Sequence, residues 1–172
     1  KAKENLQGII KDITSTMETK FKEEFDIINK HFSRVFTQLF GGGRAELVLE
    51  DADNVLTSGI EIVAQPPGKK LQSISLLSGG EKALTAISIL FAILEHKPAP
   101  FCVLDEIDAA LDESNVQSFG QYLRKFSERT QFVLITHRRG TMENSDVLYG
   151  VAMEEKGVSR MVSVRLEDEI AS

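Results

Sequence analysis

The feature that most constrains this 172-residue chain is a regular stripe of apolar residues in its first 40 positions. From Leu6 to Leu39 an apolar residue recurs at every third or fourth position, without proline and with only Gly8 as a weak helix former. The spacing predicts one amphipathic helix of about 35 residues, roughly 50 Å long. An average globular helix is about a third of that length. We therefore expect a coiled-coil helix that protrudes and needs a partner for its stripe, with a helix packed on its own domain as the alternative.

After this helix the chain alternates between short apolar runs and helical patterns. Gly41, Gly42 and Gly43 should end the first helix, because glycine tolerates the left-handed backbone that follows a helix. Strand, helix, strand order with continuous apolar strands indicates a parallel sheet covered on both faces. The expected fold is therefore α/β with a mainly parallel sheet. The expected strands are residues 45–49, 60–64, 101–104, 132–135, 147–153 and 158–166, and the expected helices are residues 80–95, apolar nearly all round and hence buried, and 116–126.

Composition excludes several classes of protein. The net charge of −6 counts against a surface that neutralises phosphates broadly. A single cysteine, Cys102, can form no internal disulfide, which fits a reducing cytoplasmic setting. The longest apolar run, residues 86–94, is far shorter than the roughly 20 residues of a membrane span, and the charged first residues predict no signal peptide.

A glycine-containing segment stands directly before the expected helix at residues 80–95. Its residues are Leu77, Ser78, Gly79, Gly80, Glu81 and Lys82. Ser78 can cap the helix and Glu81 can complete a capping box. The two glycines leave the helix N-terminus bare, so that backbone N–H groups and the positive end of the dipole can face an anion. From these residues alone, a capped helix start without a ligand is an equal alternative.

Acidic residues and a histidine follow two of the expected strands. Asp105 and Glu106 end the strand at 101–104, at the edge where open α/β sheets bind ligands. His137 follows the strand at 132–135 and is expected at the same edge. The alternative is structural, with Asp105 capping a turn and Glu106 solvated. The remaining histidines are interpreted as a helix-face residue, His31, and a loop residue, His96.

The order and spacing of these motifs resemble the ABC-type ATPases. In that resemblance Ser78 to Glu81 are the signature, Asp105 and Glu106 the Walker B acids, Ala110-Leu111-Asp112 the D-loop and His137 the switch histidine. Longer stretches, at residues 40–45, 97–101, 105–112 and 136–142, are similar to the C-terminal head segment of bacterial SMC (structural maintenance of chromosomes) proteins. This similarity covers essentially the whole chain. It implies a coiled-coil stub at residues 1–40 and the C-terminal lobe of an ATPase head at residues 41–172.

The phosphate-binding P-loop is missing from this sequence. At Gly68-Lys69, the one Gly-Lys pair, the first glycine position of the motif holds Val63 and the hydroxyl position holds Lys70. In SMC proteins the P-loop lies in a separate N-terminal segment. The resemblance therefore implies half of a head, which alone hydrolyses little or no ATP.

The same resemblance implies how a completed head works. Two heads sandwich two ATP molecules, and the segment from Leu77 to Lys82 meets the γ-phosphate bound to the opposite head. Asp105 helps to hold Mg²⁺, Glu106 acts as general base on the attacking water, and His137 contacts the γ-phosphate or the water. The D-loop, with Ala110, Leu111 and Asp112, passes between the two sites.

The implied partners are the N-terminal head segment, a second head in a homodimer, a kleisin subunit and DNA, without a membrane. The implied function is ATP-dependent chromosome condensation and segregation in the cytoplasm, at the nucleoid. Two alternatives stay open at this stage. One is the head of a related coiled-coil ABC ATPase of DNA double-strand-break repair, and the other is a non-catalytic ABC-like scaffold that binds a partner through its helix.

Overall fold

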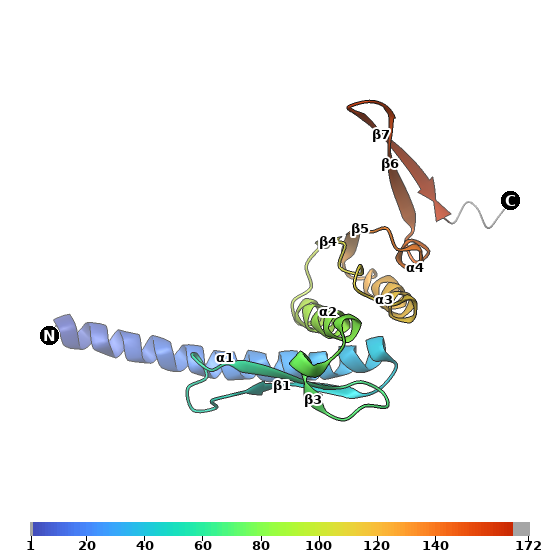
Figure 1. The fold of residues 1–172 in the computed structure, drawn as a ribbon. Coiled ribbons are helices and arrows are strands. Elements are labelled where there is room, and N and C mark those ends of the chain that lie inside the picture. Colours follow the sequence, from blue (N-terminus) through green and yellow to red (C-terminus); the bar gives the residue numbers. More distant parts are fainter. Residues whose placement is uncertain (1, 167–172) are drawn as a thin grey trace. The chain divides into compact units, whose positions relative to one another are not determined.

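The computed structural model describes residues 2–166, which form two compact units (Figure 1). The first unit extends to Pro98 and the second begins at Ala99, and each is described by itself. The first contains α1 (Ala2–Phe40), β1 (Arg44–Leu49), β2 (Ile60–Gln65), β3 (Gln72–Ser73), a short 3₁₀ helix (Ile74–Leu76) and α2 (Gly79–His96). The second contains β4 (Phe101–Asp105), α3 (Glu113–Phe126), β5 (Gln131–Ile135), α4 (Arg139–Met142), β6 (Val147–Glu155) and β7 (Val158–Arg165). No helix among these residues has the length and apolar character needed to cross a membrane.

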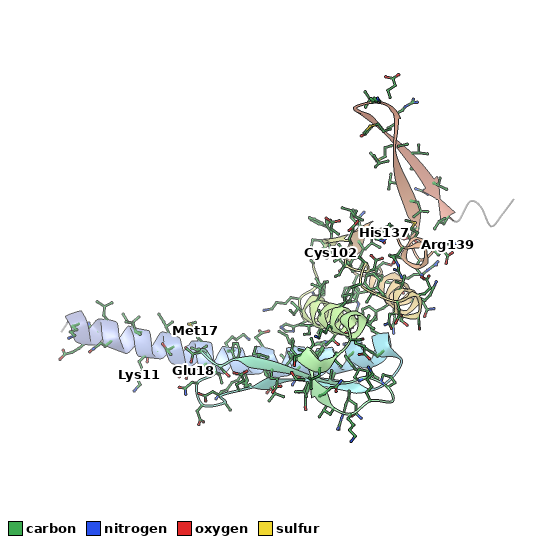
Figure 2. All side chains as sticks on the ribbon, in the orientation of Figure 1. Lys11, Met17, Glu18, Cys102, His137 and Arg139 are labelled. Carbon is green, nitrogen blue, oxygen red and sulfur yellow. The ribbon has the colours of Figure 1, made fainter. Side chains whose placement is uncertain are left out.

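The predicted long helix is confirmed, since α1 has 39 residues and is about 58 Å long. Its apolar stripe serves two purposes along its length. Near the N-terminus Leu6 and Met17 are 60% and 53% exposed, and Figure 2 shows Met17 on the part of α1 that extends beyond the sheet. Near the C-terminus Phe32 and Phe36 are completely buried. Half of the stripe therefore builds the core of this unit, and the other half is available for a partner helix.

The three glycines end α1 as predicted. Gly41 has a φ of +65°, and the N–H of Gly42 donates to the carbonyl of Thr37 at 2.9 Å, which is the Schellman pattern. Gly43 also has a positive φ, of +78°, and a Cβ there would lie 2.2 Å from the carbonyl oxygen of Gln65, so that a side chain does not fit. The chain can therefore turn at once from the helix into β1.

The core of the first unit forms where the C-terminal half of α1 meets the sheet and α2. Phe36 stacks on Phe40 with ring centroids 4.1 Å apart and meets Phe32 edge to face. The seven buried residues of this cluster come from both helices, two strands and the turn before α2: Phe32, Phe36, Ala45, Leu47, Ala64, Leu77 and Ala92. Leu77 thereby anchors the segment before α2 to the core.

One side chain of α1 satisfies the edge of the sheet. β1 is an edge strand in the order β1-β2-β3. The amide of Asn29 donates to the carbonyl of Leu47 at 3.1 Å and accepts from the N–H of Leu47 at 2.8 Å. This two-way pairing replaces a neighbouring strand at that residue and fixes α1 against β1.

Two glutamate–histidine pairs join α1 to α2. His96 is the last residue of α2, not a loop residue as interpreted from the sequence, and its Nε2 contacts the carboxylate of Glu24. About two turns further along α1, His31 Nδ1 lies 2.9 Å from Glu95 Oε2. Hydrogen bonds from Lys20 and then from His96 hold the pKa of Glu24 below its usual range. The C-terminal end of α2 is therefore joined to α1 by polar side-chain contacts as well as by packing.

The predicted buried helix is α2, but only part of its surface is buried. Leu84, Ile87 and Phe91 are at most 2% exposed, whereas Ile93 is 46% exposed. A helix that is apolar nearly all round needs cover on every side. The described residues supply that cover on one face.

The prediction of a mainly parallel sheet is wrong for the described residues. They form three small sheets, of which β1-β2-β3 and β6-β7 are antiparallel and only β4-β5 is parallel. A parallel pair needs a crossover connection, and α3 between β4 and β5 is one. The alternation of exposed and buried residues in β1 is typical of an antiparallel strand with one covered face. The predicted closing hairpin around Gly157 is confirmed as β6 and β7.

We expect Asn29→Ala to lower the free energy of unfolding of the chain by about 1–2 kcal/mol, because it leaves both polar groups of Leu47 without their partner. Urea denaturation followed by circular dichroism measures this loss. Lys30→Ala is the matched control, since Lys30 is the next residue on α1 and is exposed. Equal stability of the two variants would contradict the role given to the Asn29 amide.

Candidate functional site

The parallel strands β4 and β5 bring Glu106 and His137 together. Their register pairs Asp105 with Ile135, and the N–H of Glu106 extends the ladder by donating to the carbonyl of Ile135 at 2.8 Å. His137 Nδ1 lies 3.8 Å from Glu106 Oε1, and both side chains are more than 60% exposed. Figure 2 labels His137 in this unit. The structure thus places both residues at one edge of the sheet, as the sequence predicted, and leaves them open to a ligand.

The backbone of Glu106 is strained. Its φ of +48° is the only positive φ of a non-glycine residue among those described. The bond from its N–H to Ile135 and a bond from the N–H of Ala109 to its own carbonyl, at 3.1 Å, hold this conformation. Such a conformation costs on the order of 1–3 kcal/mol, and residues that adopt it cluster at active sites, ligand-binding sites and switch regions. The strain is therefore an independent indication that the direction of the Glu106 carboxylate matters.

Asp105 is the residue that can hold a metal ion at this edge. It ends β4 and is exposed. Within residues 2–166 no group of three or more His, Cys, Asp or Glu could hold a metal by itself. Mg²⁺ is commonly held by one or two carboxylates, with waters and substrate phosphates supplying the other oxygens. A single hard carboxylate therefore fits Mg²⁺ bound together with a nucleotide, and does not fit a structural metal.

The segment before α2 forms the capping box that its sequence predicts. Ser78 is the N-cap, its hydroxyl accepts from the N–H of Glu81, and Glu81 Oε2 accepts from the N–H of Ser78 at 2.9 Å. The Ser78 hydroxyl also donates to Glu81 Oε2 at 2.9 Å. A Cβ added at Gly79 would meet nothing within 4 Å, so an anion can approach this helix start closely. The capped start and the anion-binding start, posed as alternatives, are therefore compatible.

The residues around this capping box divide into buried and accessible ones. Leu77 is 5% exposed and belongs to the core, so that it can act only by holding its neighbours in place. Gly80 is half-buried, and Lys82 is exposed. Lys69 adds a positive charge on the other side, with its Nζ 2.8 Å from Glu81 Oε1. This hydrogen bond is the main reason that the pKa of Glu81 lies below its usual range, and those from Ser78 act in the same direction.

The predicted D-loop connects β4 to α3. Ala110 is exposed, and Leu111 is buried at 3% exposure. Asp112 is the N-cap of α3, where its carboxylate accepts from the N–H of Asn115 at 2.8 Å. In this structure Asp112 therefore has a local role as a helix cap, which was not predicted from the sequence.

Sequence reasoning missed a buried carboxylate next to this site. Asp108 is 1% exposed, and its Oδ2 accepts from the hydroxyls of Thr136 and Thr141. Nothing in the sequence distinguishes Asp108 from the exposed acids around it. Its hydrogen-bond partners lie 28 and 33 positions further along the chain.

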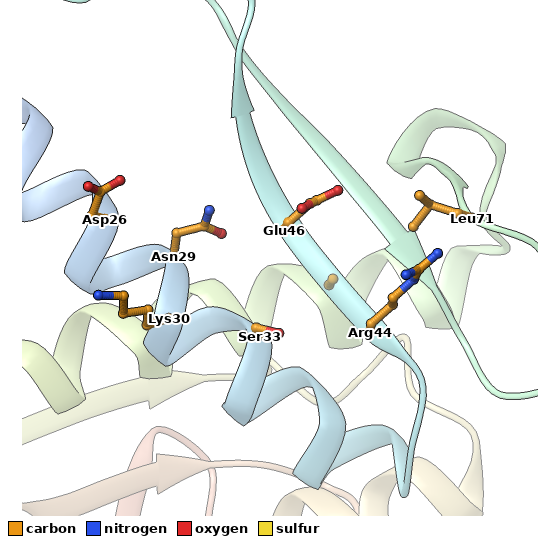
Figure 3. A pocket seen from close by; sticks show the side chains of 8 residues that line it. Asp26, Asn29, Lys30, Ser33, Arg44, Glu46 and Leu71 are labelled. Atoms are coloured by element: carbon orange, nitrogen blue, oxygen red, sulfur yellow. The ribbon is translucent and has the colours of Figure 1, made fainter.

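The groove drawn in Figure 3 is a separate feature, located between α1 and β1. It has a volume of about 470 Å³ and contains none of the residues predicted from the motifs. Two acidic and two basic side chains line it, and this mixture does not favour a phosphate. Its lining residues are Asp26, Asn29, Lys30, Ser33, Arg44, Ala45, Glu46 and Leu71.

The acids after β4 and the histidine after β5 lie at the carboxyl edge of a parallel pair of strands, which is where open α/β sheets bind ligands. The chain belongs to the RecF/RecN/SMC N terminal domain family, whose model matches residues 4–160. It is 59% identical over 167 residues to the chromosome partition protein Smc of Bacillus subtilis and 60% identical to that of Lactiplantibacillus plantarum. Each match covers 97% of this chain, which spans about 14% of the length of these curated relatives.

Solved structures of SMC proteins also match this chain. The Smc head domain of Pyrococcus furiosus, with an extended coiled coil and bound to the C-terminal domain of ScpA, matches with a TM-score of 0.85 and 41% identity, over 98% of this chain and 42% of that one. A structure from work on ATP-driven dimerization and DNA-stimulated activation of SMC ATPases matches with a TM-score of 0.81 and 42% identity, over 90% and 93% of the two chains. The resemblance to SMC heads is therefore confirmed, and the chain is a mixed α/β fragment of such a head with a long N-terminal helix. Its assignment to the C-terminal half, with a boundary at residue 40, stays a prediction.

We expect Glu81→Gln to lower the free energy of unfolding by about 0.5–1 kcal/mol near neutral pH, because the amide loses its ion pair with Lys69. Folding lowers the pKa of Glu81. Its stabilising contribution is therefore complete above the ordinary pKa of a glutamate and is lost as the pH falls through the lowered value.

The difference between wild type and Glu81→Gln should consequently shrink as the pH falls below the ordinary pKa of a glutamate, about 4.3. Denaturation midpoints measured between about pH 7 and pH 3.5 test this, with Glu61→Gln, at an exposed position of β2, as the control. A constant difference over that range would contradict the ion pair as its cause.

Proposed function

We propose that this chain is the C-terminal half of an SMC ATPase head, which takes part in chromosome partitioning once an N-terminal segment supplies the P-loop. The observation that carries this proposal is the strained Glu106 beside His137 at the carboxyl edge of β4 and β5. A general base and a polar partner at that edge suit the attack of water on a bound phosphate. Relatives that are chromosome partition proteins favour this function over DNA break repair.

Exposed apolar side chains on β4 and β5 support the idea of an incomplete head. Phe101 and Val103 are 62% and 56% exposed, and Val133 and Ile135 are 48% and 53% exposed. Parallel sheets are normally covered on both faces, so a pair of strands this open needs further strands and helices. The sequence contains no P-loop motif, and on this proposal the covering segment supplies it.

In the completed head the residues at the strand edge divide the work. Asp105 would hold Mg²⁺, which when bound neutralises charge on the phosphates. Glu106 would accept the proton of the attacking water on a carboxylate oxygen, and His137 would donate a hydrogen bond to the γ-phosphate or to the water. Their exposure lets a nucleotide from the completing segment reach both side chains.

The start of α2 would serve the second head. Ser78 and Gly79 would offer the hydroxyl and backbone N–H groups to the γ-phosphate bound opposite, where the helix dipole favours negative charge. The phosphate-binding groups then belong to two chains, so that ATP joins the heads and hydrolysis releases them. The D-loop, residues 110–112, would lie between the two sites.

We also propose the partners of this assembly from those of the relatives. The Pyrococcus furiosus head is bound to the C-terminal domain of ScpA, and we propose that this chain contributes to binding a kleisin of that kind. DNA-stimulated activation is named for related SMC ATPases, which makes DNA a proposed ligand of the ring. Residues 1–40 would continue into the coiled coil, and the protein would act in the cytoplasm, at the nucleoid.

We expect Glu106→Gln to trap the ATP-bound dimer of heads assembled from this chain and its N-terminal segment. The amide keeps the shape of the side chain but cannot accept a proton, so hydrolysis should fall by about 10²–10⁴-fold. Phosphate release and sedimentation velocity with ATP measure the two effects. Glu128→Gln, at an exposed position after α3, is the control. Substituted heads that bind ATP and stay monomeric would refute the sandwich.

We expect Ser78→Arg to abolish ATP-driven dimerisation while a single head still binds nucleotide, because a bulky cation then occupies the approach to the start of α2. Nucleotide binding by fluorescence and dimerisation by sedimentation separate the two steps. Ser127→Arg, after α3, tests the same change elsewhere on the surface. Loss of nucleotide binding by the isolated head would contradict a role of Ser78 toward the opposite head.

A further inference from the structure

A buried hydrogen-bond cluster lies directly behind Glu106 and His137. Asp108 follows Glu106 by two residues, on the turn that leaves β4, and is 1% exposed. Its Oδ2 accepts from Thr136 Oγ1 at 2.7 Å and from Thr141 Oγ1. One carboxylate oxygen therefore joins the turn after β4 to the segment after β5.

The hydroxyl of Thr136 connects Asp108 to the backbone on both sides of His137. Thr136 immediately precedes the histidine, and its Oγ1 also accepts from the N–H of Arg138 at 2.9 Å. The residues on both sides of His137 are thus held by one hydroxyl, which is held in turn by Asp108. The imidazole itself has no part in the cluster and remains 64% exposed.

The second donor, Thr141, is fixed by close packing of α4 on α3. A Cβ at Gly140 would lie 2.9 Å from Val116 Cγ1 and 3.0 Å from Gln117 Nε2, so a side chain there would force these neighbours to shift. The amide of Asn144 donates to the carbonyl of Gly140 at 2.8 Å. Asp108 is therefore positioned by a firm part of the unit rather than by a loose loop.

Stability is a poor explanation for a carboxylate at this place. Asp108 Oδ1 is buried and has no hydrogen-bond partner among the described residues. A buried polar atom without a partner costs free energy, which an apolar side chain of similar size avoids. A positional role explains better why both hydroxyls converge on the other oxygen.

We propose that Asp108 is a positioning residue for ATP hydrolysis, acting through Thr136 to hold His137 beside Glu106. This inference rests on the proposed function of the edge of β4 and β5. Asp108 touches neither reacting group, so its loss changes the placement of His137 and leaves its chemistry intact. The side chain is buried, and nucleotide binding and head engagement should therefore continue without it.

The test uses heads assembled from this chain and its N-terminal segment. Thr136→Val removes the hydroxyl and keeps the shape, and the expected result is a fall in kcat of roughly tenfold to a hundredfold with an unchanged KM for ATP. With hydrolysis slowed and engagement intact, the ATP-bound dimer should accumulate. A fold weakened by the substitution would instead give less dimer. Thr136→Ser restores the hydroxyl and should recover most of the rate.

Thr130→Val is the matched control. Thr130 is also 1% exposed, and its hydroxyl donates to the carbonyl of Ala99 at 2.8 Å, just before the opposite end of β5. The Thr130→Val substitution removes a buried hydroxyl that has no link to His137. The kcat of this variant should therefore stay within about twofold of wild type. An equal loss of kcat in Thr130→Val and Thr136→Val would overturn the proposal.

Asp108→Asn tests the positioning role a second time, because an uncharged amide accepts weaker hydrogen bonds from the two threonine hydroxyls than a carboxylate does. Its expected behaviour is that of Thr136→Val, including accumulation of the dimer. Wild-type rates in both Thr136→Val and Asp108→Asn would overturn the positioning role. A wild-type assembly that binds ATP without hydrolysing it would instead refute the proposed function on which the role depends.

Discussion

The parallel pairing of β4 with β5 is the constraint on which the candidate site depends. Five residue pairs set its register, and one further backbone bond, from Glu106 to Ile135, carries it past the end of β4. A shift of one residue would move Glu106 and His137 to different faces of the strands. α3 is the crossover that makes this pairing possible, and Asp112 at its N-cap sets where the crossover begins.

Incomplete burial is the second organising property of the chain. Apolar side chains remain exposed at the N-terminal half of α1 and on β4 and β5, in both units. Monomeric proteins rarely expose contiguous apolar surfaces of this kind, whereas segments of larger assemblies do. The folding stability of such a segment depends on its partners by mass action, and on the proposed function so does its ATPase activity. One set of surfaces would therefore control both properties.

Features that depend on neighbours in sequence were predictable, and features that depend on distant contacts were not. The length of α1, its end at Gly41 and the capping box of Ser78 follow from local spacing and backbone preference. The sheet was mispredicted because short apolar runs do not show which strands pair or in which direction. Asn29 and Asp108 were missed since each acquires its role from a residue at least 18 positions away, Leu47 and Thr136 respectively. The placement of Glu106 and His137 at one edge was predictable because strand ends and chain order determine it.

The start of α2 shows how folding and the proposed function share the same atoms. The Ser78 hydroxyl has one proton, which it donates to Glu81 Oε2 while it accepts from the N–H of Glu81. A γ-phosphate that accepts a hydrogen bond from this hydroxyl must replace the Glu81 carboxylate as the acceptor. Lys69 already neutralises much of the charge on Glu81, and the N–H of Ser78 still donates to the same oxygen, so the carboxylate keeps partners after the exchange. On the proposed function, the capping box thus holds Ser78 in place before ATP arrives. The Ser78 hydroxyl can then turn its hydrogen bond from Glu81 to the phosphate at modest cost, because Glu81 does not depend on Ser78 alone.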